Sequence, residues 1–160
     1  MFTKLCKTNR KIIMILQNIK LKSIKGVMVL LSIIGLIVSI YLSIYHFLGV
    51  PLFCSTSGLI NCNNVINSPY GFIFGIPVSD FGVAFFLIEL GVLFLIKDPF
   101  AKIFVNTVGL SFVIYFLYAE YMVGNICEYC TSVHIIVVIL LVLSIYLYRR
   151  ETKLTINNTK

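Results

Sequence analysis

Charged residues are scarce in this sequence, and their scarcity excludes most soluble folds. Only 12% of the 160 residues are charged, whereas 59% are hydrophobic and the mean hydropathy is +1.01. A soluble domain is about 45–50% apolar, so we expect a membrane protein. A bilayer core about 30 Å thick takes roughly 20 helical residues per crossing. About four crossings would use most of the chain and leave no room for a soluble domain.

Basic residues are absent from two segments, and this absence predicts the orientation of the chain. None of the 13 Lys and Arg residues lies in residues 49–75 or 124–130. Short loops rich in Lys and Arg stay on the cytoplasmic side of the plasma (inner) membrane. Both termini are therefore predicted to be cytoplasmic, and the two segments without basic residues extracytoplasmic. Because the basic residues flank apolar runs instead of gathering on a solvated face, no nucleic acid partner is expected.

No internal repeat, low-complexity stretch or signal-peptide cleavage site is apparent.

Four apolar runs are the candidate membrane spans. The first, Gly26 to Leu48, exceeds the about 7–15 residues of a signal-peptide core. It is therefore predicted to be the first span, ending at Gly49 and Pro51. The other predicted spans run from about Ile76 to Ile96, from Asp98 to Val123 and from about Thr131 to Tyr148.

Several residues at the ends of these runs are typical start or stop signals. Asp98 followed by Pro99 is typical of an N-cap and a first helical residue, and Gly124 is typical of a helix end. The other expected signals are Ser79 or Asp80 at the start of the second span and Arg149 with Arg150 at the end of the fourth.

The predicted fold is an all-α membrane protein. It is a four-transmembrane-helix bundle in residues 26–150, with an outer loop cap between its first two helices. Residues 1–25 are predicted to be a basic cytoplasmic leader, either a helix at the inner membrane surface or a solvated segment. Residues 151–160 are predicted to be a cytoplasmic tail.

Four of the five cysteines fall in the segments predicted to be extracytoplasmic, whereas Cys6 falls inside. The outer side is oxidising, so Cys54, Cys62, Cys127 and Cys130 can form disulfides. Cys127 and Cys130 form a C-x-x-C at the start of the fourth span. Amide donors and the helix dipole favour a thiolate at such a position. Structural disulfides, a zinc site or coincidence are alternative interpretations, but no metal is expected at an oxidising surface with this cysteine spacing.

Two other polar side chains lie within the spans. His134 follows Cys130 by four residues, so it shares the same helical face and is positioned to pass a proton or to hydrogen-bond at the interface. Glu89 lies inside the second span, and intramembrane carboxylates often mark ion pathways. A four-span exporter is therefore a rival hypothesis to thiol chemistry, and a non-enzymatic scaffold with structural disulfides is another.

The combined motifs resemble those of the bacterial vitamin K epoxide reductase family. The resemblance rests on an ordered set that covers most of residues 27–148: Cys54-x7-Cys62, Asn67-Ser68-Pro69-Tyr70, Gly75-Ile76-Pro77 and Cys127-Glu128-Tyr129-Cys130. It implies a four-helix bundle around a quinone, either menaquinone or ubiquinone. Cys127 and Cys130 would be the active pair, and Cys54 and Cys62 the shuttle pair.

The resemblance also implies a function and a set of quinone contacts. Bacterial members pass electrons from a thioredoxin-like thiol oxidase on the outer side to membrane quinone, which supports disulfide formation in exported proteins. Many carry this partner as a fused domain, but here a separate protein is expected. Quinone-epoxide reduction is the alternative main activity. Some members place an asparagine where this chain has Val78; the candidate quinone-binding residues are Ser68, Ser79, Asp80 and His134.

Overall fold

The computed structural model describes residues 2–49, 52–54, 58–96 and 98–158, so Pro51 lies outside the described residues. Its long elements are four helices, and a short helix, a 3-10 turn and a two-stranded hairpin connect the first two of them. In chain order the elements are α1 (Phe2–Leu48), α2 (Cys62–Ile66), η1 (Pro69–Gly71), β1 (Phe72–Ile73), β2 (Ile76–Pro77), α3 (Val78–Leu95), α4 (Pro99–Val123) and α5 (Glu128–Asn158).

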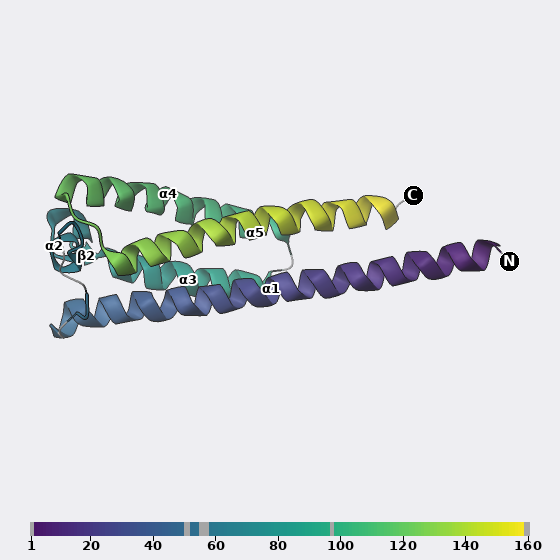
Figure 1. The fold of residues 1–160 in the computed structure, drawn as a ribbon, viewed down its shortest axis with the longest axis horizontal. Helices are drawn as coiled ribbons and strands as arrows, with labels where there is room; N and C mark the ends of the chain where they lie inside the picture. The colour runs from purple at the N-terminus through teal and green to yellow at the C-terminus, as the bar shows by residue number, and fades with distance from the viewer. Residues whose placement is uncertain (1, 50–51, 55–57, 97, 159–160) are drawn as a thin grey trace.

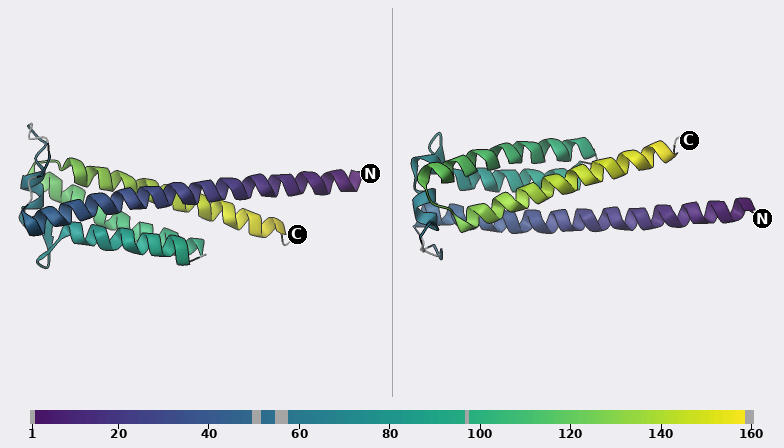
Figure 2. Two further views of the ribbon diagram at one scale, coloured as in Figure 1. Left: turned by 90° about the horizontal axis from the view of Figure 1, so that it is seen from below. Right: turned by 45° about the horizontal axis from the view of Figure 1, so that its top comes forward.

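The four long helices lie side by side as a bundle (Figure 1). The short elements α2 and β2 lie at one end of it, and both termini lie at the other, as the views in Figure 2 also show. We call these the cap end and the terminal end. Within the described residues, four helical segments are long and apolar enough to cross a membrane: Ile19–Leu48, Val78–Leu95, Pro99–Val123 and Glu128–Thr152. The predicted four-helix bundle with a loop cap is therefore confirmed.

The start and end of α4 follow the predicted local signals. Asp98 is the N-cap, and its carboxylate accepts the Phe100 N–H at 3.0 Å, while Pro99 is the first helical residue. Gly124 ends the helix in the left-handed conformation with φ 69°. α3 begins at Val78, close to the predicted start of the second span, but the predicted cap at Ser79 or Asp80 is wrong, because Pro77 is the N-cap. Asp80 instead accepts a hydrogen bond from the Ser43 hydroxyl of α1.

The first and last helices are longer than predicted. The predicted first span, Gly26 to Leu48, is the second half of α1, which begins at Phe2. Residues 2–25 are therefore helical, one of the two predicted alternatives, and contain neither proline nor glycine to interrupt the helix. α5 begins at Glu128, not at Thr131, and continues through Arg149 and Arg150 to Asn158. Arginine is a good helix former, so these two residues do not end the helix.

Glycines allow close approach where the helices cross. A Cβ at Gly35 of α1 would lie 2.2 Å from Phe86 Cζ of α3, and one at Gly109 of α4 would lie 2.5 Å from Phe85 Cε2. The bundle core is apolar and consists of Met28, Phe86, Val113, Ile136, Val137, Leu140 and Leu147. The outward faces also carry large apolar side chains, as lipid contact requires; examples are Leu30, Ile37, Leu87, Phe94, Ile114 and Val142.

Candidate active site at the cap end

The loop cysteines are joined at the start of α2. Cys54 and Cys62 form a disulfide with a Cα–Cα distance of 6.2 Å, which confirms the pairing implied by the resemblance. Cys62 is the first residue of α2 and is fully buried. Asn61 is the N-cap of this helix, since its side-chain oxygen accepts the Asn64 N–H at 3.2 Å. This cap fixes where Cys62 enters the protein interior.

A parallel β-bridge brings the two cysteine segments together. The bridge pairs Ile60 with Ile126: the Asn61 N–H donates to the Ile126 carbonyl at 3.2 Å, and the Ile126 N–H donates to the Leu59 carbonyl at 2.9 Å. Cys62 and Cys127 follow directly along the two segments, and both are fully buried in one cluster that Cys54 and Cys130 also contact. The loop pair and the C-x-x-C pair thus share one compartment, as thiol–disulfide exchange requires.

The C-x-x-C pair lies at the start of the fourth membrane-spanning helix, as predicted: Cys127 directly precedes α5, and Cys130 is on its first turn. The Cys127 carbonyl accepts the Thr131 N–H at 2.9 Å, which makes Cys127 the N-cap, and its sulfur accepts the Cys130 N–H at 3.4 Å. Both thiols are reduced in this structure. The hydrogen bond from the Cys130 thiol lowers the pKa of the Cys127 thiol, although burial and the charge of Glu120 act in the opposite direction. Cys127 is therefore the thiol of this pair that is primed for exchange.

Glu120 is a site residue that sequence reasoning missed. It lies near the end of α4, is only 8% exposed, and its carboxylate accepts the Cys127 N–H at 3.1 Å. The possible signal was an acidic residue seven positions before Cys127 in a chain with only 6 acids. The sequence alone does not show that the turn at Gly124 folds this carboxylate back over the C-x-x-C.

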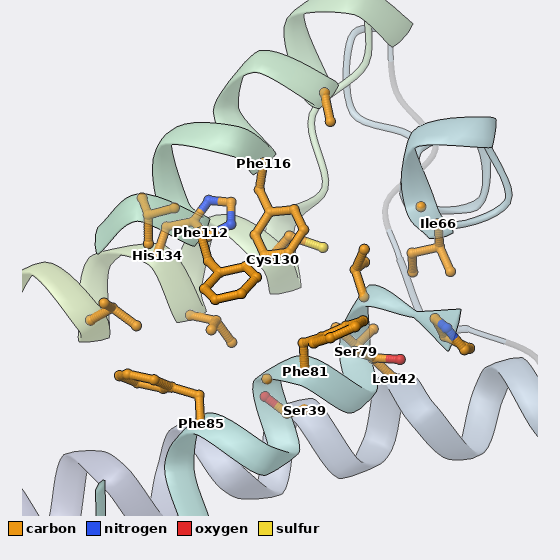
Figure 3. A pocket seen from close by; sticks show the side chains of 18 of the residues that line it. Ser39, Leu42, Ile66, Ser79, Phe81, Phe85, Phe112, Phe116, Cys130 and His134 are labelled. Atoms are coloured by element: carbon orange, nitrogen blue, oxygen red, sulfur yellow. The ribbon is translucent and has the colours of Figure 1, made fainter. Parts of the chain in front are cut away.

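An apolar cavity opens beside Cys130 within the bundle. It holds about 960 Å³ of empty space, part of it open to the surroundings, and every long helix contributes to its wall. Figure 3 shows Cys130 and His134 of α5 with Phe112 and Phe116 of α4, facing Phe81 and Phe85 of α3. A wall of aromatic and aliphatic side chains with few polar groups suits a flat, apolar ligand.

Two of the predicted ligand-binding residues line this cavity. His134 is 6% exposed and stacks on Phe116 with a ring-centroid distance of 5.8 Å and an interplanar angle of 7°. Its Nδ1 has no hydrogen-bond partner within the described residues, so a ligand in the cavity can supply one. Ser79 also lines the cavity, next to Val78.

The other two predicted residues lie outside the cavity wall. Ser68 is buried, and its hydroxyl donates to the Val65 carbonyl at 2.8 Å, so it holds the end of α2. Val65 itself lines the cavity. Asp80 accepts the bond from Ser43 described above and joins α3 to α1. Among the described residues there is no group of His, Cys, Asp and Glu side chains that could hold a metal ion.

Comparison with known proteins gives one family. Residues 26–145 match the Vitamin K epoxide reductase family, and this range contains both cysteine pairs, the capping loop and the cavity. A search of the curated proteins finds no match.

Proposed function

The chain belongs to the vitamin K epoxide reductase family, whose enzymes are quinone-dependent thiol oxidoreductases, and we propose that it oxidises a separate thioredoxin-like partner on the outer side of the plasma membrane. In this proposal electrons pass from the partner's thiols to Cys54–Cys62, then to Cys127–Cys130, and finally to a membrane quinone, menaquinone or ubiquinone. The oxidised partner introduces disulfides into exported proteins. The observation that carries the proposal is one buried cluster containing both pairs, with Cys130 on the wall of an apolar cavity.

The difference in exposure between the two loop cysteines supports different roles for them. Cys54 is half-buried, whereas Cys62 is fully buried beside Cys127. A thiolate of the partner would attack Cys54, breaking the Cys54–Cys62 bond and releasing Cys62 as a thiolate. The partner's second thiol would break its bond to Cys54 and free Cys54. The Cys62 thiolate would attack Cys127, break a Cys127–Cys130 disulfide and release Cys130, and Cys54 would then attack Cys62, so that Cys54–Cys62 forms again and Cys127 is left reduced. Phe53 is 85% exposed beside Cys54 and offers an apolar contact for the docking partner.

The cavity residues fit a quinone. His134 has an unpartnered ring nitrogen at the cavity wall, and aromatic side chains such as Phe112 and Phe116 provide flat apolar contacts. A bound quinone would supply an acceptor for two electrons and two protons. We assign His134 and Ser79 to hydrogen bonding of that ring. We assign Ser68 and Asp80 to holding the wall through α2 and α1, respectively.

Orientation belongs to the same proposal. The cap end is extracytoplasmic and the terminal end, where both termini lie, is cytoplasmic. The reason is the set of basic residues at the start of the first span and the end of the fourth: Lys20, Lys22, Lys25, Arg149 and Arg150. Fusing a reporter to either terminus should give cytoplasmic signals, and a thiol label added from outside should reach Cys54 after reduction. An external C-terminus contradicts this orientation.

Separate electron donors test the relay. Cys54→Ala or Cys62→Ala should abolish oxidation of the protein partner but retain quinone reduction by a small dithiol, which attacks Cys127–Cys130 directly. Cys130→Ala should abolish quinone reduction with both donors. Ser132→Ala on the exposed side of α5 is the matched control. If the loop variants lose dithiol-driven reduction as completely as Cys130→Ala does, the four cysteines form one structural unit and the relay is wrong.

A further inference from the structure

A buried carboxyl group beside a reactive thiol needs a chemical explanation. Glu120 is more than nine-tenths buried near the end of α4, and its carboxylate accepts a hydrogen bond from the Cys127 amide. An amide oxygen would accept that bond equally well. A capping role therefore does not explain an ionisable group at a site where burying a charge is costly.

Glu120 touches both parts of the redox site. Its carboxylate lies against the first turn of α5, which carries the C-x-x-C, and it also forms part of the cavity wall that contains Cys130 and His134. A proton held on Glu120 is thus placed between the thiols and the cavity. Few other side chains on that wall can carry one, since most of it is aliphatic or aromatic.

The titratable neighbours define the electrostatics at this position. On the cavity wall they are Cys130 and His134 of α5 and Tyr70 of η1. In the cysteine cluster they are Cys127 and, packed against it, Tyr45 of α1 and Tyr129 of α5, with the exposed Glu128 next to Cys127 in the chain. From α2, Cys62 is in a disulfide and does not titrate. No described Lys or Arg lines the cavity or the cysteine cluster, so a Glu120 carboxylate and a Cys127 thiolate repel each other without a compensating cation.

We propose that Glu120 is the proton acceptor and donor of the Cys127–Cys130 pair, a role that rests on the proposed thiol chemistry. When the pair is reduced, two electrons break its S–S bond and two protons are taken up. One proton goes to Cys130, and the other is shared by Cys127 and Glu120. When the disulfide forms again, two electrons and two protons leave for the acceptor of the proposed function in the cavity: Cys130 gives up its own proton directly, and Glu120 takes the proton from Cys127 and releases it into the cavity. The carboxyl group thereby moves one proton per two electrons.

The test is the Glu120→Gln variant of the full-length protein. Glutamine is of similar size and keeps a side-chain oxygen that can accept the Cys127 N–H, but it cannot take up or release the proton. The rate of alkylation of reduced Cys127, resolved by mass spectrometry, is measured against pH. Without the opposing carboxylate the thiolate should form at lower pH, and alkylation below the wild-type pKa should rise by about tenfold, the equivalent of one pKa unit. Glu128→Gln, an exposed carboxyl group next to Cys127, is the matched control and should change the rate much less.

A second readout is the pH dependence of the midpoint potential of the Cys127–Cys130 couple. As the pH rises, the number of protons taken up per two electrons should fall from two to one. This change should occur at a lower pH in Glu120→Gln than in wild type. Glu120→Asp, which restores a carboxyl group, should recover the wild-type proton number, and it also serves if Glu120→Gln does not fold. Unchanged alkylation and an unchanged proton number in Glu120→Gln overturn the proposal and leave Glu120 a structural cap. Neither readout contains quinone, so they stand apart from the test of quinone reduction.

Discussion

Glu120 and Glu89 are both buried carboxyl groups on membrane-spanning helices, but they have different neighbours. Glu120, toward the cap end, accepts a bond from a redox-active segment and borders a cavity. Glu89, toward the terminal end, is fully buried and accepts the Asn106 side-chain N–H at 3.0 Å. Asn106 also donates to Ser144 at 3.2 Å, so this second group joins α3, α4 and α5. Glu120 therefore contacts the redox site, whereas Glu89 contacts a neighbouring helix of the bundle.

The difference indicates that the two halves of the bundle have separate tasks. Toward the terminal end, polar groups meet one another: Lys102 is buried on α4, and Lys25 forms an ion pair with Glu151 at 3.1 Å. Toward the cap end, the unpartnered Nδ1 of His134 belongs to the wall of a cavity that a ligand can fill. Intramembrane hydrogen bonds between helices contribute about 0.6 kcal/mol on average. Changes toward the cap end should therefore affect turnover, and changes toward the terminal end should affect stability.

The largest effect is expected from His134→Leu. This change removes the unpartnered ring nitrogen from the cavity wall and replaces the imidazole with an apolar side chain of similar size. Loss of one hydrogen bond of about 1.4 kcal/mol to the quinone would raise its KM about tenfold. Steady-state quinone reduction with a small dithiol as donor measures this. His46→Leu, at the other histidine of the chain and outside the cavity wall, should leave KM unchanged; equal KM values for wild type and His134→Leu would remove His134 from the site.

The features that the sequence could predict depend on local signals. The four spans, the start of α4 at Asp98 and the place of the C-x-x-C on the first turn of α5 depend on local patterns, and the structure confirms them. The Cys54–Cys62 pairing came from the resemblance and is also confirmed. These features are set within a few residues of each signal, so a single sequence contains them.

Features that depend on packing between distant segments were not predictable. Glu120 reaches Cys127 only because the α4–α5 turn folds back, and Asp80 bonds to α1 instead of capping its own helix. The lengths of α1 and α5 were underestimated because hydropathy marks the membrane-spanning part of a helix, whereas the helix itself continues for as long as good helix formers follow.

A smaller effect is expected from Asn106→Leu, which tests the stabilising role of the terminal-end group. The change removes a donor to both Glu89 and Ser144 and should lower the free energy of unfolding by about 1 kcal/mol. Denaturant titration of the purified protein in detergent measures this. Thr107→Leu is the matched control, because Thr107 is exposed and bonds within its own helix, to the Ile103 carbonyl. The activity per folded molecule should be unchanged in both variants; a loss of turnover in Asn106→Leu would contradict the division between the two halves.

The smallest effect is expected from Glu89→Gln. Glutamine keeps the side-chain oxygen that accepts the Asn106 N–H, so the link between α3 and α4 should persist, and only the ability to carry a proton or a charge is lost. Thiol oxidation should stay within about twofold of wild type, and stability within about 0.5 kcal/mol, as for a substitution that preserves its hydrogen bond. Both are measured with the assays described above. The exporter hypothesis alone requires the charge of this residue, because an ion pathway needs a group that can bind and release its ion. Complete loss of thiol oxidation in Glu89→Gln would show that the two buried glutamates act together and that the terminal end takes part in the reaction.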